Sequence, residues 1–128
     1  METKEIVNQL RKVRELMKEE KYDDAIALIN KLKELDKNND FDYNFTHQLY
    51  QLDSNARSLF NQQIILKQIQ EISRDQNSIT FNDLNQLLKQ KTELNLSNDI
   101  LRREIEILIL RNQLSCKLDG DKIKLDSA

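Results

Sequence analysis

Residues that interrupt helices are almost absent from this sequence. Its 128 residues include no proline and a single glycine, Gly120. Proline and glycine most often break regular backbone, so their absence leaves long stretches that can run as helix. Apolar residues also recur at steps of three and four over most of the chain, which is the period of a helix with one buried face. The sequence therefore predicts a mainly α protein.

Residues 1–75 are predicted to form about four antiparallel helices, packed as a bundle or as a short helical repeat. In the first of these helices Ile6, Leu10 and Val13 share one face with Met17. Polar breaks between the apolar stripes separate the helices. The predicted helical ranges are 3–20, 22–36, 42–52 and 55–73.

Several polar residues are expected to begin these helices. Thr3 is a candidate N-cap for the first, because its hydroxyl can accept from a backbone N–H of the first turn. Asp23 and Asp24 stand in the first turn of the second, where a carboxylate is favoured by the helix dipole. Asp53 or Ser54 is expected to cap the helix that begins near residue 55.

The sequence pattern of residues 76–128 predicts a helix, a loop, a second helix and a two-stranded hairpin, which is the order of a winged helix. Thr80 is expected to cap the first of these helices, with Asp83 three residues later. Ser97 is expected to cap the second. The sequence thus predicts two domains, with residues 1–75 helical and residues 76–128 forming a winged helix.

The hairpin is predicted from alternation and from its turn. Leu114, Cys116 and Leu118 alternate with polar residues, which is the period of a half-buried strand. The dipeptide Asp119-Gly120 favours a type I′ turn, in which both central residues have positive φ. A second alternating stretch follows this turn.

The hairpin also supplies the candidate protein interface. A terminal hairpin leaves one strand edge unpaired, and such an edge invites strand addition by a neighbouring protein. Lys122 and Lys124 are open to the opposite interpretation, as charges that discourage pairing at that edge. The candidate interface residues are Leu114, Cys116, Leu118, Ile123 and Leu125.

Nucleic-acid binding is the alternative function. In a winged helix that reads DNA, basic residues of the second helix and the hairpin meet the groove and the flanking phosphates. Residues 76–128 nevertheless contain eight basic and eight acidic side chains, whereas a dedicated DNA reader is usually plainly basic. The candidate nucleic-acid contacts are Arg102, Arg103, Arg111, Lys117, Lys122 and Lys124.

Catalysis, metal binding and cofactor binding find little support. His47 is the only histidine, and the sequence has no second metal-ligand group at suitable spacing. Cys116 falls on the apolar side of a strand, without a visible base to activate it. The run 119–121 has too few oxygen donors for calcium and is explained by the turn. We expect no catalytic residue, no metal, no cofactor and no small-molecule substrate.

The overall charge and hydropathy give expectations about the surroundings of the protein. Its formal net charge is −2, which gives no general attraction to nucleic acid or to an acidic membrane. The longest apolar run, 105–110, is interrupted by Glu106 and is far too short to cross a bilayer. The start of the chain lacks a signal-peptide pattern, and a single cysteine allows no internal disulfide. We expect an intracellular protein of the cytoplasm, the nucleus or both.

The C-terminal part resembles the PCI domain, which is shared by subunits of the proteasome lid, the signalosome and a translation initiation factor. In that family the second helix carries a glutamate followed by an apolar pair, and Glu104 or Glu106 fits this place. Typical members have a longer helical arm, and the loop 90–95 is longer here than is usual. The segments that carry the resemblance are 78–84, 101–109 and 114–119, with Cys116-Lys117-Leu118-Asp119 matching the strand that opens the wing.

The resemblance implies assembly rather than chemistry. PCI subunits are non-catalytic scaffolds whose winged helices pack edge to edge within large complexes. We therefore expect a scaffold or adaptor subunit that binds other protein subunits through its helix faces and the edge of its winged helix. A nucleic-acid-binding winged helix is the alternative.

Overall fold

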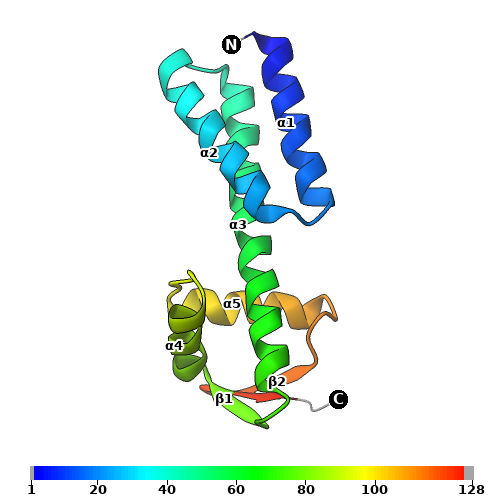
Figure 1. The fold of residues 1–128 in the computed structure, drawn as a ribbon, viewed down its shortest axis with the longest axis vertical. Helices are drawn as coiled ribbons and strands as arrows, with labels where there is room; N and C mark the ends of the chain where they lie inside the picture. Colours follow the sequence, from blue (N-terminus) through cyan, green and yellow to red (C-terminus); the bar gives the residue numbers. More distant parts are fainter. Residues whose placement is uncertain (1, 126–128) are drawn as a thin grey trace. The chain divides into compact units, whose positions relative to one another are not determined.

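The protein is mainly helical, with a small antiparallel sheet near its C-terminal end (Figure 1). The computed structural model describes residues 2–125. Within this range lie five helices and three strands. In chain order they are α1 (Thr3–Lys18), α2 (Tyr22–Asn39), α3 (Tyr43–Ile72), β1 (Ser78–Thr80), α4 (Phe81–Lys91), α5 (Asn98–Leu110), β2 (Cys116–Asp119) and β3 (Lys122–Leu125).

The chain divides into two compact units between Phe60 and Asn61, within α3. We call them the N-terminal and the C-terminal unit. Helix α3 contributes its first half to the N-terminal unit and its second half to the C-terminal unit. The predicted division after residue 75 stays a prediction.

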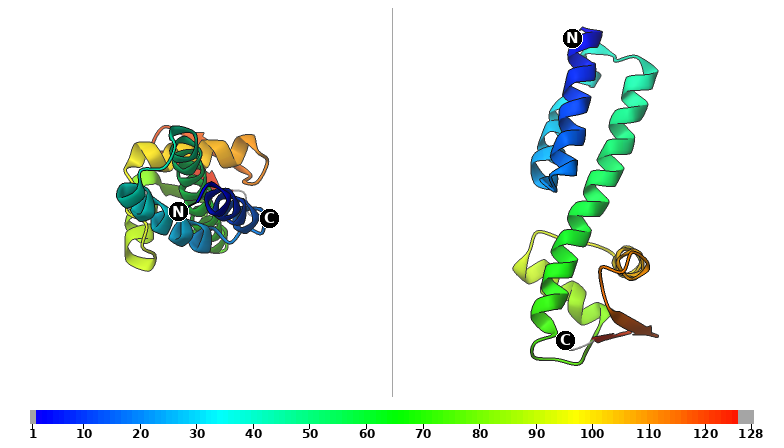
Figure 2. Two further views of the ribbon diagram at one scale, coloured as in Figure 1. Left: turned by 90° about the horizontal axis from the view of Figure 1, so that it is seen from above. Right: turned by 90° about the vertical axis from the view of Figure 1, so that its right-hand side faces the viewer.

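The N-terminal unit consists of α1, α2 and the first half of α3, with α1 and α2 running antiparallel (Figure 2). The apolar face predicted for the first helix is confirmed, since Ile6, Leu10 and Val13 are buried and Met17 packs against them. A broad apolar face on each helix holds such a bundle together, because each buried aliphatic side chain contributes about 1.5–3 kcal/mol. The buried core of this unit comprises Ile6, Leu10, Val13, Ala25, Ile29, Leu32, Phe41, Leu49 and Ala56.

Two expectations for helix starts in this unit are wrong. Thr3 is the first residue of α1 rather than its cap, and Glu2 occupies the N-cap without a side-chain cap bond. The predicted helices 42–52 and 55–73 form one continuous helix, α3, so three helices rather than four precede the sheet. Asp53 therefore lies in mid-helix.

Neighbouring helices explain why α3 continues through Asp53. Its carboxylate accepts hydrogen bonds from Lys33 Nζ of α2 at 2.6 Å and from Arg57 Nε one turn later at 2.8 Å. Arg57 also donates to Asn30 Oδ1 at 3.0 Å. With these partners the carboxylate does not compete for backbone N–H groups, which is how an aspartate usually ends a helix.

The C-terminal unit packs the second half of α3, together with α4 and α5, on the three-stranded sheet (Figure 1). The strand order is β1-β3-β2, and both pairs are antiparallel. Strand β1 is absent from the prediction, which gave only the β2–β3 hairpin. The buried apolar residues of this unit are Ile65, Ile69, Ile79, Phe81, Leu84, Leu88, Leu94, Leu101, Ile105, Leu108, Cys116, Ile123 and Leu125.

Both helix caps predicted for this unit are confirmed. Thr80 Oγ1 accepts from the N–H of Asp83 at 3.0 Å, and Ser97 Oγ accepts from the N–H of Ile100 at 3.2 Å. Each bond satisfies a backbone donor that the first turn of a helix leaves without a partner. These caps fix where α4 and α5 begin.

The hairpin turn differs from the predicted type. Asp119 pairs with Lys122, so Gly120 and Asp121 are the two central residues. Only Gly120 has positive φ, at 60°. This is the pattern of a type II′ turn, which takes glycine at its first central position. The prediction of a type I′ turn centred on Asp119-Gly120 is therefore wrong by one residue in register.

Candidate interaction surface

The strand register separates the sheet into an inner and an outer face. Paired residues of neighbouring strands share a face, so Ile79, Ile123 and Leu118 lie in one row on the inner side. The opposite face is hydrophilic and rich in lysine. Its residues are Ser78, Thr80, Lys117, Asp119, Lys122 and Lys124.

The structure places most of the candidate protein-interface residues inside the unit. Ile123 is fully buried on the central strand, and Cys116 and Leu125 are also buried. Leu114 and Leu118 are only half-buried. Of these five residues, Leu114 and Leu118 therefore keep the most surface for a partner.

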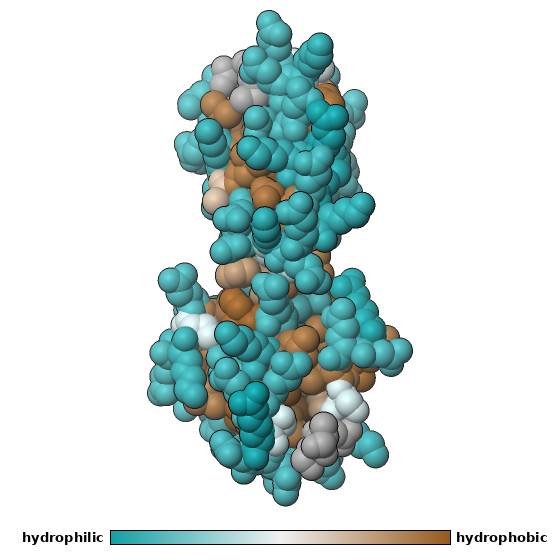
Figure 3. Space-filling model, turned by 45° about the vertical axis from the view of Figure 1, so that its right-hand side comes forward, coloured by the Kyte–Doolittle hydropathy of each residue, from teal (hydrophilic) through white to brown (hydrophobic). Residues whose placement is uncertain are grey.

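An apolar groove lies between α5 and β2. It has a volume of about 320 Å³ and is lined by Glu106, Ile109, Leu110, Cys116 and Leu118. Leu110 is 82% exposed, although it is a large aliphatic residue at the end of a helix. Figure 3 shows apolar surface interrupting the hydrophilic exterior of the C-terminal unit. An exposed apolar patch rimmed by polar residues is typical of a protein-binding site.

Sequence reasoning missed Leu110, although the signal was present. Residues 107–110 are four consecutive apolar residues in a predicted helix. Successive helical residues point about 100° apart, so four in a row cannot all face one core. At least one of them had to lie on the outside.

The edges of the sheet are β1 and β2, because β3 is paired on both sides. Lys122 and Lys124 belong to this central strand. The suggestion that they discourage pairing at an open edge is therefore wrong. Within residues 2–125, β2 has a sheet partner on one side only.

Two of the three arginines of the candidate nucleic-acid set, Arg102 and Arg103, have internal partners. Arg102 donates to the carbonyl oxygen of Gly120 and lies 4.5 Å from the centre of the Phe81 ring, so it joins α5 to the hairpin turn. It also lies 3.8 Å from Glu106. Arg111 is exposed at the C-cap of α5. Of these two arginines, only Arg111 keeps its side chain largely accessible.

Arg103 lies beside a buried acid. Its guanidinium is 3.6 Å from Glu104, whose side chain is almost fully buried. The Glu104 carboxylate also accepts from Gln62 Nε2 of α3 at 3.0 Å. A buried carboxylate must be hydrogen-bonded to be tolerated, so this pair serves to hold α5 against α3.

The three lysines of the candidate set lie together on the outer face of the sheet. Lys117 stands directly opposite Lys124. Lys124 Nζ is 3.3 Å from Asp119 Oδ2, which offsets one of these charges. Like charges directly across a strand pair are destabilising, so this face favours an incoming negative charge beside Lys117.

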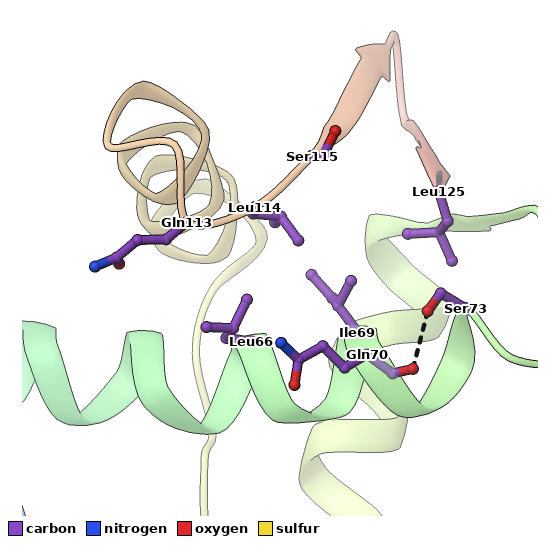
Figure 4. A pocket seen from close by; sticks show the side chains of 8 residues that line it. All are labelled: Leu66, Ile69, Gln70, Ser73, Gln113, Leu114, Ser115 and Leu125. Carbon is purple, nitrogen blue, oxygen red and sulfur yellow. Dashed lines mark hydrogen bonds between the residues drawn. The ribbon is translucent and has the colours of Figure 1, made fainter. Parts of the chain in front are cut away.

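A second hollow lies between the C-terminal end of α3 and the segment before β2. Its volume is about 170 Å³, below the range of about 300–1,000 Å³ usual for small-molecule sites. Figure 4 shows aliphatic side chains from both sides pointing toward one another, with Ser73 Oγ donating to the Gln70 carbonyl oxygen at 2.9 Å. This hollow has the character of incomplete core packing rather than of a ligand site.

The remaining candidates for chemistry have ordinary surroundings. His47 lies on α3, and its ring stacks on that of Tyr43 with 6.1 Å between centroids. Cys116 is buried in the sheet. Over residues 2–125, no group of three or more His, Cys, Asp or Glu side chains is arranged to hold a metal ion.

No helix within the described range is both long and apolar enough to cross a membrane. Comparison with known proteins does not assign the chain to a family. No family model, no curated protein and no solved structure matches this chain.

Proposed function

We propose that the C-terminal unit is a winged helix and that it binds protein, as part of a non-catalytic scaffold or adaptor subunit of a multi-protein complex. The order of helix, strand, two helices and two strands supports this fold assignment. The resemblance to PCI domains supports the scaffold role. In this interpretation α5 is the helix that a DNA-reading relative would insert into the major groove.

The surface of α5 carries the proposal. Leu110 and Glu106 line the groove together, and Ile100 and Asp99 are also exposed on α5. Apolar and acidic side chains are poorly suited to a phosphate-lined groove, where basic and amide side chains make the contacts. They are well suited to a protein partner that buries the leucine and leaves the charges at the rim.

A quantitative pull-down with matched variants tests the proposal. The tagged chain is used as bait in extract of the source cells, and the recovered proteins are quantified. Leu110→Asp places a charge in the groove without disturbing the core, and Val7→Asp is the control, because Val7 is an exposed apolar residue of the other unit. We expect a defined set of partners that Leu110→Asp removes and Val7→Asp retains. Equal recovery with both variants would overturn the groove as the binding site.

The lysines on the outer face of the sheet support a second candidate function, nucleic-acid binding. Lys117, Lys122 and Lys124 are all exposed on one surface. Each phosphate neutralised by a lysine contributes about 0.9 to the slope of log K against log salt for duplex DNA. Binding whose slope falls by about one for each lysine changed to alanine would favour this function. Absence of binding at low salt would exclude it.

A further inference from the structure

The exposed edge strand β2 has a sequence that is complementary to itself. Its last three residues are Lys117, Leu118 and Asp119, a cation and an anion placed symmetrically about a leucine. Lys117 and Asp119 lie on the outer face of the sheet, whereas Leu118 lies on the inner face beside the groove. An antiparallel copy of the same strand would therefore present the opposite charge at each outer position.

The hydrogen-bond pattern of the sheet decides which backbone groups face the open edge. Leu125 N–H donates to the Asn77 carbonyl oxygen at 2.8 Å, so this group of β3 points toward β1 rather than toward β2. Bonded and non-bonded pairs alternate along an antiparallel ladder. Leu125 therefore forms a non-bonded pair with Cys116 of β2. The pair Leu118–Ile123, two residues away along both strands, is non-bonded for the same reason. It follows that the N–H and C=O of Leu118 face outward at the edge.

We propose that β2 pairs with β2 of a second copy of this chain, about a two-fold axis at Leu118. Leu118 of each copy then exchanges two backbone hydrogen bonds with its counterpart, in the register that its outward groups require. In that register Lys117 of each copy stands opposite Asp119 of the other. The two sheets become continuous across the axis.

Two local features favour this partner over an unrelated strand. Lys117 faces Lys124 within its own sheet, and the carboxylate of Asp119 from the second copy offsets that like-charge contact. Leu110, 82% exposed beside Leu118 in the groove, gains an apolar neighbour across the axis. The inference rests on the proposed protein-binding role of this surface and names one partner for it.

Sedimentation measurements on the full chain test the pairing. We expect a monomer–dimer equilibrium between about 10 µM and about 1 mM, since an interface this small gives weak association. Lys117→Asp and Asp119→Lys each replace two attractive contacts with two repulsive ones and should weaken the dimer by about tenfold or more. Lys89→Asp is the control, because it makes the same charge change at an exposed residue of α4, away from β2 in the same unit.

Mixing the two single variants gives the sharpest test of the register. Lys117→Asp has acids at both outer positions and Asp119→Lys has cations at both, so each pairs poorly with itself but well with the other. We expect an equimolar mixture to associate at least as strongly as the original chain. Leu118→Pro removes the outward N–H without touching the β2–β3 ladder and should abolish dimer formation.

Each outcome decides the inference. A chain that stays monomeric at about 1 mM, a dimer that Lys117→Asp leaves unchanged, or a mixture that fails to associate would overturn it. The protein-binding role is separable, because partner recovery lost through Leu110→Asp would stand even if the chain proved monomeric. Circular dichroism of each variant verifies that loss of association does not come from unfolding.

Discussion

Replacing Asp53 removes a carboxylate that joins α2 to the middle of α3. The Asp53 side chain is 13% exposed and bonds to Lys33 at 2.6 Å and to Arg57 at 2.8 Å. In Asp53→Ala, both cations lose this acceptor. We expect the N-terminal unit to become less stable, with its fold unchanged.

The exposure of the partners sets the size of the effect. Removing one member of a fully buried ion pair costs about 3–5 kcal/mol. Here Lys33 and Arg57 keep 23% and 49% of their side-chain surface exposed, so water can solvate both cations again. The cost of the substitution then approaches that of losing a hydrogen bond to a charged group, which is about 1.5–3 kcal/mol. We expect Asp53→Ala to lower the free energy of unfolding by about 2 kcal/mol.

Urea denaturation followed by circular dichroism at the helix band measures this change. Glu34→Ala is the matched control, because Glu34 is 71% exposed and lies 3.7 Å from Lys37, and loss of such a surface pair costs under about 0.5 kcal/mol. Asp53→Asn tests the physical reason. Asparagine and aspartate have similar propensities for the interior of a helix, but asparagine carries no charge for Lys33. Stability equal to the original chain in Asp53→Asn would refute the ion-pair account.

Three further substitutions in the C-terminal unit have defined expectations, each measured by the same denaturation. Arg102→Ala loses both its bond to the Gly120 carbonyl and its contact with the Phe81 ring, and should cost about 1–2 kcal/mol, with Arg102→Lys recovering little of it. Gly120→Ala should cost about 1–2 kcal/mol from its φ of 60° alone, because no atom lies within 4 Å of the added Cβ. Asn85→Ala removes bonds to the Leu96 carbonyl at 2.7 Å and to Asn98 Oδ1 at 2.9 Å, and should cost about 1–3 kcal/mol and speed amide exchange in the α4–α5 loop.

Local signals in the sequence were sufficient for much of the C-terminal unit. Thr80 and Ser97 cap their helices as expected, because capping depends on a side chain and the backbone three residues later. The alternation around Leu118 likewise marks a strand. The turn was misplaced by one residue, because Gly120 can occupy either central position and only the pairing of Asp119 with Lys122 decides which.

Features that depend on distant partners could not be predicted from local patterns. Asp53 resembles a helix start until Lys33 of another helix is known to bind it. Strand β1 is three residues long, too short to show alternation, and it exists through pairing with β3. The groove beside Leu110 required both the position of β2 and the exposure of the last turn of α5.

The central position of β3 also determines when the sheet can form. Ile79 pairs with Ile123, and α4, α5 and β2 all lie between them in the chain. Closing so long a loop is slow relative to docking neighbouring helices, because the entropy is lost before any pairing is gained. During synthesis β1 must wait for its partner until the segment that contains Lys122–Leu125 has left the ribosome, whereas α1 and α2 can associate much earlier. The newly made chain thus passes through a stage with a formed helical unit and an exposed, unpaired β1.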